Sequence, residues 1–338
     1  MRQADRTPAV RSMTLRELAA RLGSAEGYES LSTAAGTPWV AVRLNGRTSA
    51  SFHAQPNCPV VGIVESDEPP HDEVPDVVDV VATPDELASV TGAIGRNPVA
   101  ASVLVRLLRH NARVGAPDAG FAESLAYSTL QHGAEFRAWL ASRERRPPSP
   151  EPDTPVVLIE RQGDALRITL NRPHKRNAYS ASLRDGLCEA LGFAMADDTV
   201  RHIVLDGAGA CFSAGGDLDE FGEATDAGVA HASRMARNAG ALIDCLRDRI
   251  EARLHGACIG AGIELPAFAG RVVARAGTFF QLPEVGMGLI PGAGGTTSIL
   301  RRIGRRRLAY MALTGARIDV RTALDWGLID AAEEWSGL

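Results

Sequence analysis

The chain has 338 residues, of which 45% are hydrophobic and 23% are charged, with a formal net charge of −5. This is the composition of a globular protein with room for one large domain or two small ones. The net negative charge argues against nucleic acid as the main partner, because phosphate binding normally leaves a surplus of basic residues. No apolar run reaches the about 18 residues that a membrane span requires, and the polar residues 1–11 do not resemble a secretory signal. We therefore expect a cytoplasmic protein without a membrane partner.

The cysteines give no indication of a metal site or of a disulfide framework. There are five, scattered along the chain without a CxxC pair: Cys58, Cys188, Cys211, Cys245 and Cys258. An odd number without metal-binding spacing is typical of reduced, mostly buried thiols. We therefore expect that the functional site of this protein contains no metal ion.

Short apolar runs near the amino terminus predict a mixed α/β region that ends in helices. Residues 38–44 and 59–64 have the character of short strands. The segment Asp85–Arg109 predicts two helices, the second beginning near Pro98 because proline suits the first helical position. A further helix is expected from about Asp118.

A charged and proline-rich stretch, residues 143–155, marks the main joint in the chain. It contains almost no apolar residue, so it cannot bury a core and is typical of a semi-rigid spacer. After it, apolar runs alternate with helical stretches, which indicates βαβ units in a layered α/β architecture. The strands are expected at Val156–Ile159, Ala165–Leu170 and His202–Leu205, and the helices at Ser182–Met195 and Ala230–Arg249.

Three glycine-rich segments of this second part are candidates for chemistry: Phe212–Leu218, His255–Leu265 and Phe280–Thr296. A glycine-rich turn that opens a helix presents backbone N–H groups without intrahelical partners, and these can bind a negatively charged oxygen. The alternative is a tight turn whose glycines serve only packing. The segments lack the Gly-Lys-Ser/Thr of a Walker loop and a GxGxxG after a strand, so we do not expect a nucleotide-phosphate site.

Several short motifs follow one another along this second part of the chain. They are NRPHKRNA at 171–178, SAGGDL at 213–218, GAGIEL at 260–265, QLPE at 281–284 and IPGAGGT at 290–296. Taken together, their order and spacing resemble the enoyl-CoA hydratase (crotonase) superfamily. The resemblance runs from about Val156 to Asp330. It implies a layered β/α (spiral) core, an acyl-CoA thioester as substrate and no cofactor besides the coenzyme A of that substrate. It also implies a homo-oligomer, either a trimer or a dimer of trimers.

The resemblance assigns the catalytic groups by motif position. Two backbone N–H groups, those of Gly216 and Ala261, would bind the thioester oxygen as it becomes an enolate. Glu264 would activate water and Glu284 would exchange the proton at C2. Two carboxylates near one water can divide acid and base work, since their mutual repulsion separates their pKa values.

We therefore expect reversible hydration of a 2-enoyl-CoA thioester. Two alternatives stay open: isomerisation of an enoyl-CoA double bond, in which one glutamate moves a proton between carbons, and a non-catalytic subunit that binds CoA esters. The non-catalytic alternative predicts carboxylates that are splayed apart or paired with cations.

The resemblance also implies a set of residues for substrate and CoA binding. Lys175 and Arg176 lie in the loop that meets the CoA phosphates in this family, although a charged pair in a loop is often only solvated. Asp217 can instead cap the helix that follows it. The full set is Lys175, Arg176, Ala178, Ala214, Asp217, Leu218, Gly260, Pro291 and Gly292.

The chain departs from the family pattern in two ways. Pro266 can kink the helix that carries Glu264, because it lacks an N–H and its ring crowds the preceding turn. The front part, at Val78–Leu87, Ile94–Ala101 and Glu135–Arg137, resembles the carboxy-terminal portion of the same family, which suggests a tandem remnant. An unrelated helical extension is the alternative. The expected division is a partly helical segment at 1–36, a degenerate crotonase-like region at 37–146, a linker at 147–154 and a catalytic core at 155–338.

Overall fold

The computed structural model describes residues 12–44, 51–64, 74–144 and 153–335. The chain forms two compact units, one ending at Arg106 and the other beginning at Leu107. The division between the units falls within helix α4 (Pro98–Asn111). It differs from the predicted division at 147–154, a linker that lies mostly outside the described residues.

The first unit is built on a four-stranded parallel sheet. Its strands are β1 (Ser12–Thr14), β2 (Val40–Arg43), β3 (Val60–Ile63) and β4 (Val80–Ala82), side by side in chain order. The helices are α1 (Leu15–Leu22), α2 (Ala25–Ser30) and α3 (Pro84–Arg96). The strands predicted at 38–44 and 59–64 are confirmed as β2 and β3.

Sequence signals set the ends of the helices in the 85–109 region. Thr83 caps α3 in a reciprocal arrangement, in which its hydroxyl accepts the N–H of Glu86 and the Glu86 carboxylate accepts the N–H of Thr83. The next helix, α4, begins at Pro98 as predicted.

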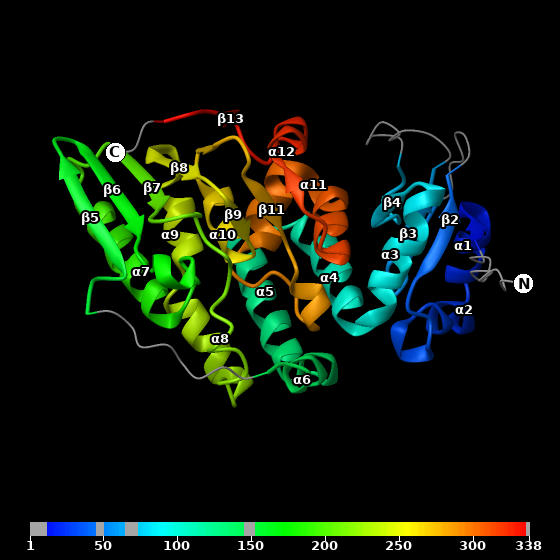
Figure 1. Ribbon diagram of the computed structural model, residues 1–338. Helices are drawn as coiled ribbons and strands as arrows, with labels where there is room; N and C mark the ends of the chain where they lie inside the picture. The colour runs from blue at the N-terminus through cyan, green and yellow to red at the C-terminus, as the bar shows by residue number, and fades with distance from the viewer. Residues whose placement is uncertain (1–11, 45–50, 65–73, 145–152, 336–338) are drawn as a thin grey trace, which may run out of the picture. The chain divides into compact units, whose positions relative to one another are not determined.

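The second unit contains a six-stranded sheet (Figure 1). Its order is β13 (Ala331–Ala332), β10 (Arg271–Ala274), β8 (Ile250–Leu254), β7 (His202–Gly207), β6 (Ala165–Leu170) and β5 (Val157–Gln162). All neighbouring strands are parallel except the β5–β6 hairpin. Helix α7 (Ala181–Ala196) connects β6 to β7, so the predicted βαβ pattern is confirmed.

A second, three-stranded sheet lies in the same unit. It consists of β9 (Ala257–Ile259) and β11 (Phe279–Gln281), which are parallel, and β12 (Ile318–Asp319), which is antiparallel to β11. The short helix α10 (Ala261–Glu264) follows β9, and the long helix α11 (Gly295–Thr314) and α12 (Val320–Trp326) follow later. Two of the glycine-rich segments continue into these helices: His255–Leu265 contains α10, and Phe280–Thr296 runs into the start of α11.

One helix prediction was wrong. The stretch 230–249 was expected as a single helix, but it is divided into α8 (Ala227–Ala236) and α9 (Ala239–Cys245), followed by a 3₁₀ turn. Asn238 causes the break, because its side chain accepts the N–H of Ala241 at 2.9 Å and so starts a new helix.

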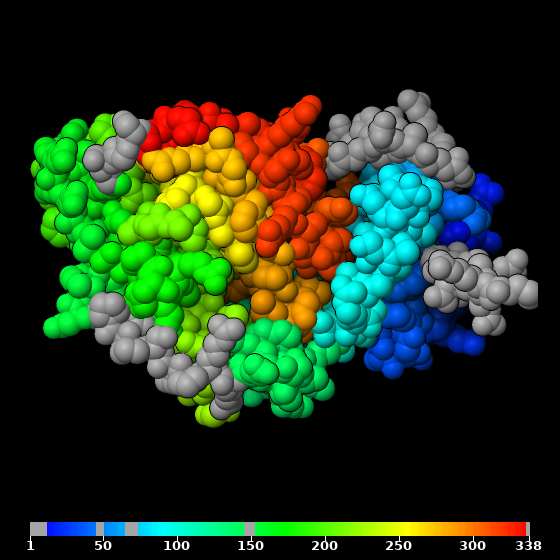
Figure 2. Space-filling view, viewed as in Figure 1, coloured from blue at the N-terminus to red at the C-terminus, as the bar shows by residue number. Residues whose placement is uncertain are grey.

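Two helices from before the linker belong to the second unit. α5 (Ala116–Gln131) packs on α8 and α11, and α6 (Ala134–Ala141) packs on the 3₁₀ turn Glu284–Met287. Figure 2 shows α6, in green, directly against this orange segment. Both helices make these contacts within one chain, with elements that follow the linker in the sequence.

Candidate active site

Three parallel segments bring the predicted site residues to one edge. β9 pairs in parallel with β11, and the segment at Ser213 forms a parallel bridge with Cys258 of β9. Parallel segments present their carboxyl ends at the same edge. Gly216, Ala261 and Glu284 each come within four positions of the paired residues, so residues from three separate motifs converge there.

The two predicted N–H donors follow glycines that no other residue could replace. Gly215 has φ +92° and Gly260 has φ +51°. An added Cβ would lie 2.8 Å from the carbonyl oxygen of Ile259 at the first position, and 2.5 Å from Glu284 Oε1 at the second.

The residues after these glycines, Gly216 and Ala261, line one cavity. Neither N–H donates to an acceptor within the part of the chain that the structure describes. The arrangement is suited to stabilising an oxygen that becomes negative during a reaction.

Glu264 is buried at the end of α10, with its carboxylate at the start of α11. Its Oε2 accepts the N–H of Ala293 at 2.7 Å and the N–H of Gly295 at 2.9 Å. The helix ends there, and the chain continues from Pro266 as a 3₁₀ turn. The effect predicted for Pro266 is thus seen, but it falls after the glutamate and leaves the position of Glu264 in a regular helical turn.

Glu284 begins the 3₁₀ turn Glu284–Met287 and is 9% exposed. Its Oε2 is buried and makes no hydrogen bond to any described group. No Lys, Arg or His nitrogen lies within 4.0 Å of the carboxylate of Glu264 or Glu284 in the described ranges. The two carboxylates are therefore not neutralised by cations.

Burial and the charges of neighbouring carboxylates raise the pKa of both glutamates. Burial raises the pKa of Glu284 to about 8, and the charge of Glu123 acts in the same direction. Burial also raises the pKa of Glu264 well above its ordinary value, with the charges of Glu284 and Glu123 adding to the effect. The N–H groups of Ala293 and Gly295 act against this rise, because they stabilise the ionised form of Glu264.

A third carboxylate, Glu123 of α5, was missed by the sequence analysis. It accepts the N–H of Gly294 at 2.7 Å, the N–H of Thr296 at 3.0 Å and the Thr296 hydroxyl at 2.5 Å. Burial raises its pKa to about 7. Glu123 and Glu264 thus hold the glycine-rich start of α11 from two sides. No sequence signal pointed to Glu123, since it lies on a helix before the linker and belongs to none of the motifs.

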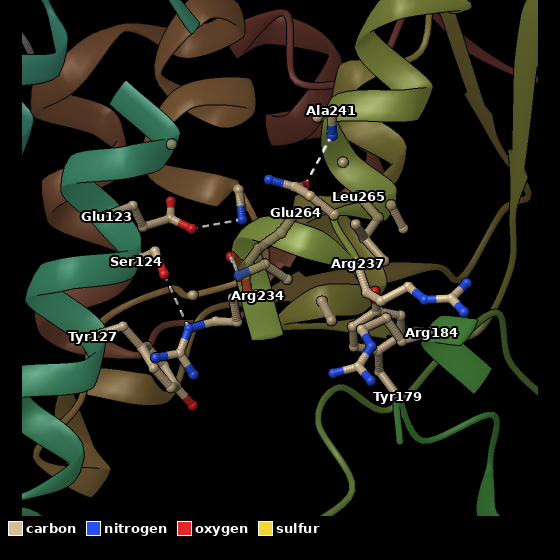
Figure 3. Close-up of a pocket in the computed structure, with 18 of the residues that line it drawn as sticks. Glu123, Ser124, Tyr127, Tyr179, Arg184, Arg234, Arg237, Ala241, Glu264 and Leu265 are labelled. Atoms are coloured by element: carbon tan, nitrogen blue, oxygen red, sulfur yellow. Dashed lines mark hydrogen bonds between the residues drawn. The ribbon is translucent and has the colours of Figure 1, made fainter. Parts of the chain in front are cut away.

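These groups surround a cavity of about 470 Å³. Figure 3 shows Glu123 and Tyr127 entering it from α5, and Tyr179 and Arg184 from the opposite side. Leu265, Phe221 and Phe268 supply apolar wall. A cavity of this kind can enclose an acyl group beside proton-transferring groups.

Most of the residues predicted to bind substrate and CoA lie outside the cavity that contains the glutamates. Asp217 and Gly292 line the cavity, whereas the other seven lie outside its wall: Lys175, Arg176, Ala178, Ala214, Leu218, Gly260 and Pro291. Lys175 Nζ pairs with Asp219 at 2.5 Å. Asp217 pairs with buried Arg172 at 2.9 Å and accepts the N–H of Asp219, so it caps a turn and not the helix that was expected.

Within the described ranges, no cluster of three His, Cys, Asp or Glu side chains has the geometry to hold a metal ion. In the same residues, no helix is long and apolar enough to cross a membrane.

Comparison with known proteins decides the family. A family model described as Enoyl-CoA hydratase/isomerase matches residues 160–333, which is more than half of the chain. The chain belongs to this family. This confirms three predictions from the sequence: the crotonase superfamily, the α/β fold class and an enzyme of this family.

Relatives with different names each match about half of the chain. The chain is 34% identical to 2,3-dehydroadipyl-CoA hydratase of Escherichia coli over 173 residues, which are 51% of the chain and 67% of that protein. It is 32% identical to 1,2-epoxyphenylacetyl-CoA isomerase of the same organism, over 51% of the chain and 68% of the relative. The crystal structure of enoyl-CoA hydratase from Mycobacterium smegmatis superimposes with a TM-score of 0.50 at 30% identity, covering 53% of the chain and 70% of that protein.

Proposed function

We propose that the protein catalyses the reversible hydration of a 2-enoyl-CoA thioester. One observation carries the proposal: two buried carboxylates share a cavity with two backbone N–H groups, and among the described residues the carboxylates have no cationic partner and the N–H groups have no acceptor. Hydration needs this combination, because the thioester oxygen must be stabilised while one group takes a proton from water and another delivers one to carbon.

The thioester oxygen accepts hydrogen bonds from the N–H groups of Gly216 and Ala261. Each donor of this kind contributes about 3–4 kcal/mol to transition-state stabilisation in comparable sites. The side chain of Ala261 does not interfere, because the donor is the backbone. As water adds to C3, electron density moves from the C2–C3 double bond onto this oxygen.

The two glutamates divide the proton transfers. Glu264, whose negative charge is stabilised by two N–H groups, accepts the proton of the attacking water. Glu284 is protonated near neutral pH because burial raises its pKa to about 8, and it delivers its proton to C2. In dehydration the same pair works in reverse, so one proton is shared between the two glutamates in both directions.

A second candidate function is isomerisation of an enoyl-CoA double bond. It is favoured by the unequal setting of the two glutamates: Glu264 is held by Ala293 and Gly295, whereas Glu284 Oε2 has no partner among the described groups and could move a proton between two carbons alone. Relatives named as hydratases and as isomerases both match this half of the chain.

One assay separates the two reactions. The purified protein is given a trans-2-enoyl-CoA and a 3-enoyl-CoA of equal length in ¹⁸O-labelled water, and the products are read by mass spectrometry. Hydration predicts labelled 3-hydroxyacyl-CoA from the 2-enoyl substrate. Conversion of the 3-enoyl substrate to the 2-enoyl product without label would establish isomerisation instead, and no turnover of either would favour a CoA-ester-binding subunit.

We extend the proposal to the assembly and the cofactor. The family resemblance supports a homo-oligomer, a trimer or a dimer of trimers, and a reaction whose only coenzyme is the CoA of the substrate. Light scattering of the purified protein and the activity of a sample treated with chelator and desalted test these two points.

A further inference from the structure

The most unusual charged group in the cavity wall is Arg234 of α8. Its Nε donates to Ser124 Oγ at 3.3 Å, its Nη1 donates to Gln131 Oε1 at 3.2 Å and its Nη2 donates to Ser128 Oγ. The guanidinium also stacks on Tyr127, with Cζ 4.8 Å from the ring centroid. Every one of these partners belongs to α5 and is electrically neutral.

The positive charge of Arg234 therefore has no direct counter-ion. Within the described residues, no carboxylate oxygen lies within 4.0 Å of its nitrogens. A guanidinium has five N–H groups, of which three are used here, so two remain for another acceptor. Burial lowers the pKa of Arg234, which shows that its charge is partly removed from water. Arg234 is half-buried, and a partly desolvated charge without a counter-ion favours an anionic ligand beside it.

The other cations at the cavity differ from Arg234. Arg184 pairs with Asp185 at 2.9 Å, and Arg237 is half exposed and lies 4.0 Å from the same carboxylate. Figure 3 shows Arg184 and Arg237 together on one side, whereas Arg234 lies beside Tyr127 on the α5 side. Glu123 influences Arg234 only electrostatically, because its oxygens are committed to Gly294 and Thr296.

The cavity joins Arg234 to the site of the reaction. Gly216 and Ala261, the proposed donors to the thioester oxygen, line the same cavity as Arg234, and so do the apolar side chains of Phe221, Leu265 and Phe268. An acyl chain whose carbonyl is held by those donors can run along this wall. Its far end then meets either the guanidinium or apolar side chains, and a guanidinium disfavours a bare methyl group.

We propose that Arg234 binds a carboxylate at the far end of the acyl chain, so that the preferred substrates are enoyl-CoA thioesters of dicarboxylic acids. This inference rests on the proposed function only in placing the thioester at Gly216 and Ala261. Arginine suits the role because its planar fork matches the two oxygens of a carboxylate.

The test compares two trans-2-enoyl-CoA thioesters of six carbons that differ only at the far end, one with a methyl group and one with a carboxylate. We expect the wild type to prefer the carboxylate-ended substrate by about tenfold to hundredfold in kcat/KM, as for other charge-assisted hydrogen bonds. In Arg234→Gln this preference should vanish, mainly through a higher KM for the carboxylate-ended substrate. Arg234→Lys should retain part of it. Repeating the pair at five and eight carbons ensures that an unsuitable length is not mistaken for a lack of preference.

The matched control is Arg201→Gln, which removes an exposed arginine outside the cavity wall and should leave both substrates unaffected. Thermal unfolding of each variant shows whether α5 and α8 still pack. If the wild type shows no preference at any length, or if Arg234→Gln slows both substrates equally, the inference is wrong. If Arg234→Gln slows both substrates equally, Arg234 either stabilises the packing of α5 on α8 or binds the CoA moiety.

Binding of the saturated analogues separates this inference from the proposed reaction. Adipoyl-CoA and hexanoyl-CoA cannot be hydrated, so calorimetric titration measures recognition alone. Tighter binding of adipoyl-CoA that is lost in Arg234→Gln supports the inference even if no enoyl thioester is hydrated. Equal binding of the two overturns it even if hydration is fast.

Discussion

Replacing Glu284 by glutamine tests the proposed chemistry with the least change in shape. The substitution keeps the size of the side chain and removes its ability to exchange a proton. We expect hydration of a 2-enoyl-CoA to slow by about 10²–10⁴-fold in kcat, which is the usual contribution of a positioned acid or base. The affinity for a saturated acyl-CoA should change little, because Glu284 is assigned to proton transfer and not to binding.

The pH dependence of the wild type follows from the shared proton. Hydration and dehydration both start from a pair that holds one proton, so kcat/KM should fall at low pH, where both glutamates are protonated, and above pH about 8, where Glu284 ionises. The reaction releases no net proton, so the pH profile of kcat/KM should be the same in both directions. The fall above pH 8 should be absent in Glu284→Gln.

The same shift has a consequence for stability. Glu284 has a pKa of about 8 in the folded protein and 4.5 as an ordinary glutamate. Between these values the unfolded chain has released this proton and the folded protein still binds it, so the free energy of unfolding decreases as pH rises. The total loss from this group approaches about 5 kcal/mol above pH 8. Glu284→Gln lacks the loss, so its stability relative to wild type should rise from pH 5 to pH 8.

The assays are initial rates in both directions from pH 5 to pH 10 and urea unfolding at pH 5 and pH 8. Full hydratase activity in Glu284→Gln would falsify the assignment of the C2 proton to this residue. If kcat/KM of the wild type does not fall near pH 8, the pKa of Glu284 is not raised during turnover. An equal stability difference at both pH values would contradict the argument from burial.

Three further predictions concern other parts of the site. Gly216→Pro deletes one oxyanion donor and should abolish turnover, whereas Ala261→Gly keeps its backbone donor and should have a kcat within about threefold of wild type. Normal turnover of the proline variant, with an unchanged circular dichroism spectrum, would mean that the thioester oxygen binds elsewhere. Glu123→Gln should lower the free energy of unfolding by about 1–3 kcal/mol, because the new amide N–H then faces the backbone N–H of Thr296. Urea unfolding measures this difference, and unchanged stability would show that the contact is not stabilising. Residues 155–338 expressed alone should aggregate, because α8 and α11 lose the cover of α5, and co-expression of residues 1–146 should rescue them. A soluble, active fragment would show that the front helices are dispensable.

The local signals in the sequence determined much of the catalytic half. Alternation of apolar runs and helical stretches predicted β6 and β7 closely, since side-chain periodicity acts over a few residues. The positions before Gly216 and Ala261 are glycines because their φ is positive and because a Cβ would contact the Ile259 carbonyl oxygen at the first position and the Glu284 carboxylate at the second. Motif order then sufficed to recognise the family, which depends on these short segments.

Tertiary structure alone decided what surrounds those segments. Glu123 and Arg234 carry no local signal, and they enter the cavity only because α5 packs on α8 and α11. The raised pKa of Glu284 has the same origin, because burial is the sum of many contacts from distant parts of the chain. The extent of the second compact unit has a related cause. A proline-rich stretch indicates only where the chain has no core of its own. The compact units depend on which helices pack together, and α5 packs on α8 and α11, which follow the linker in the sequence.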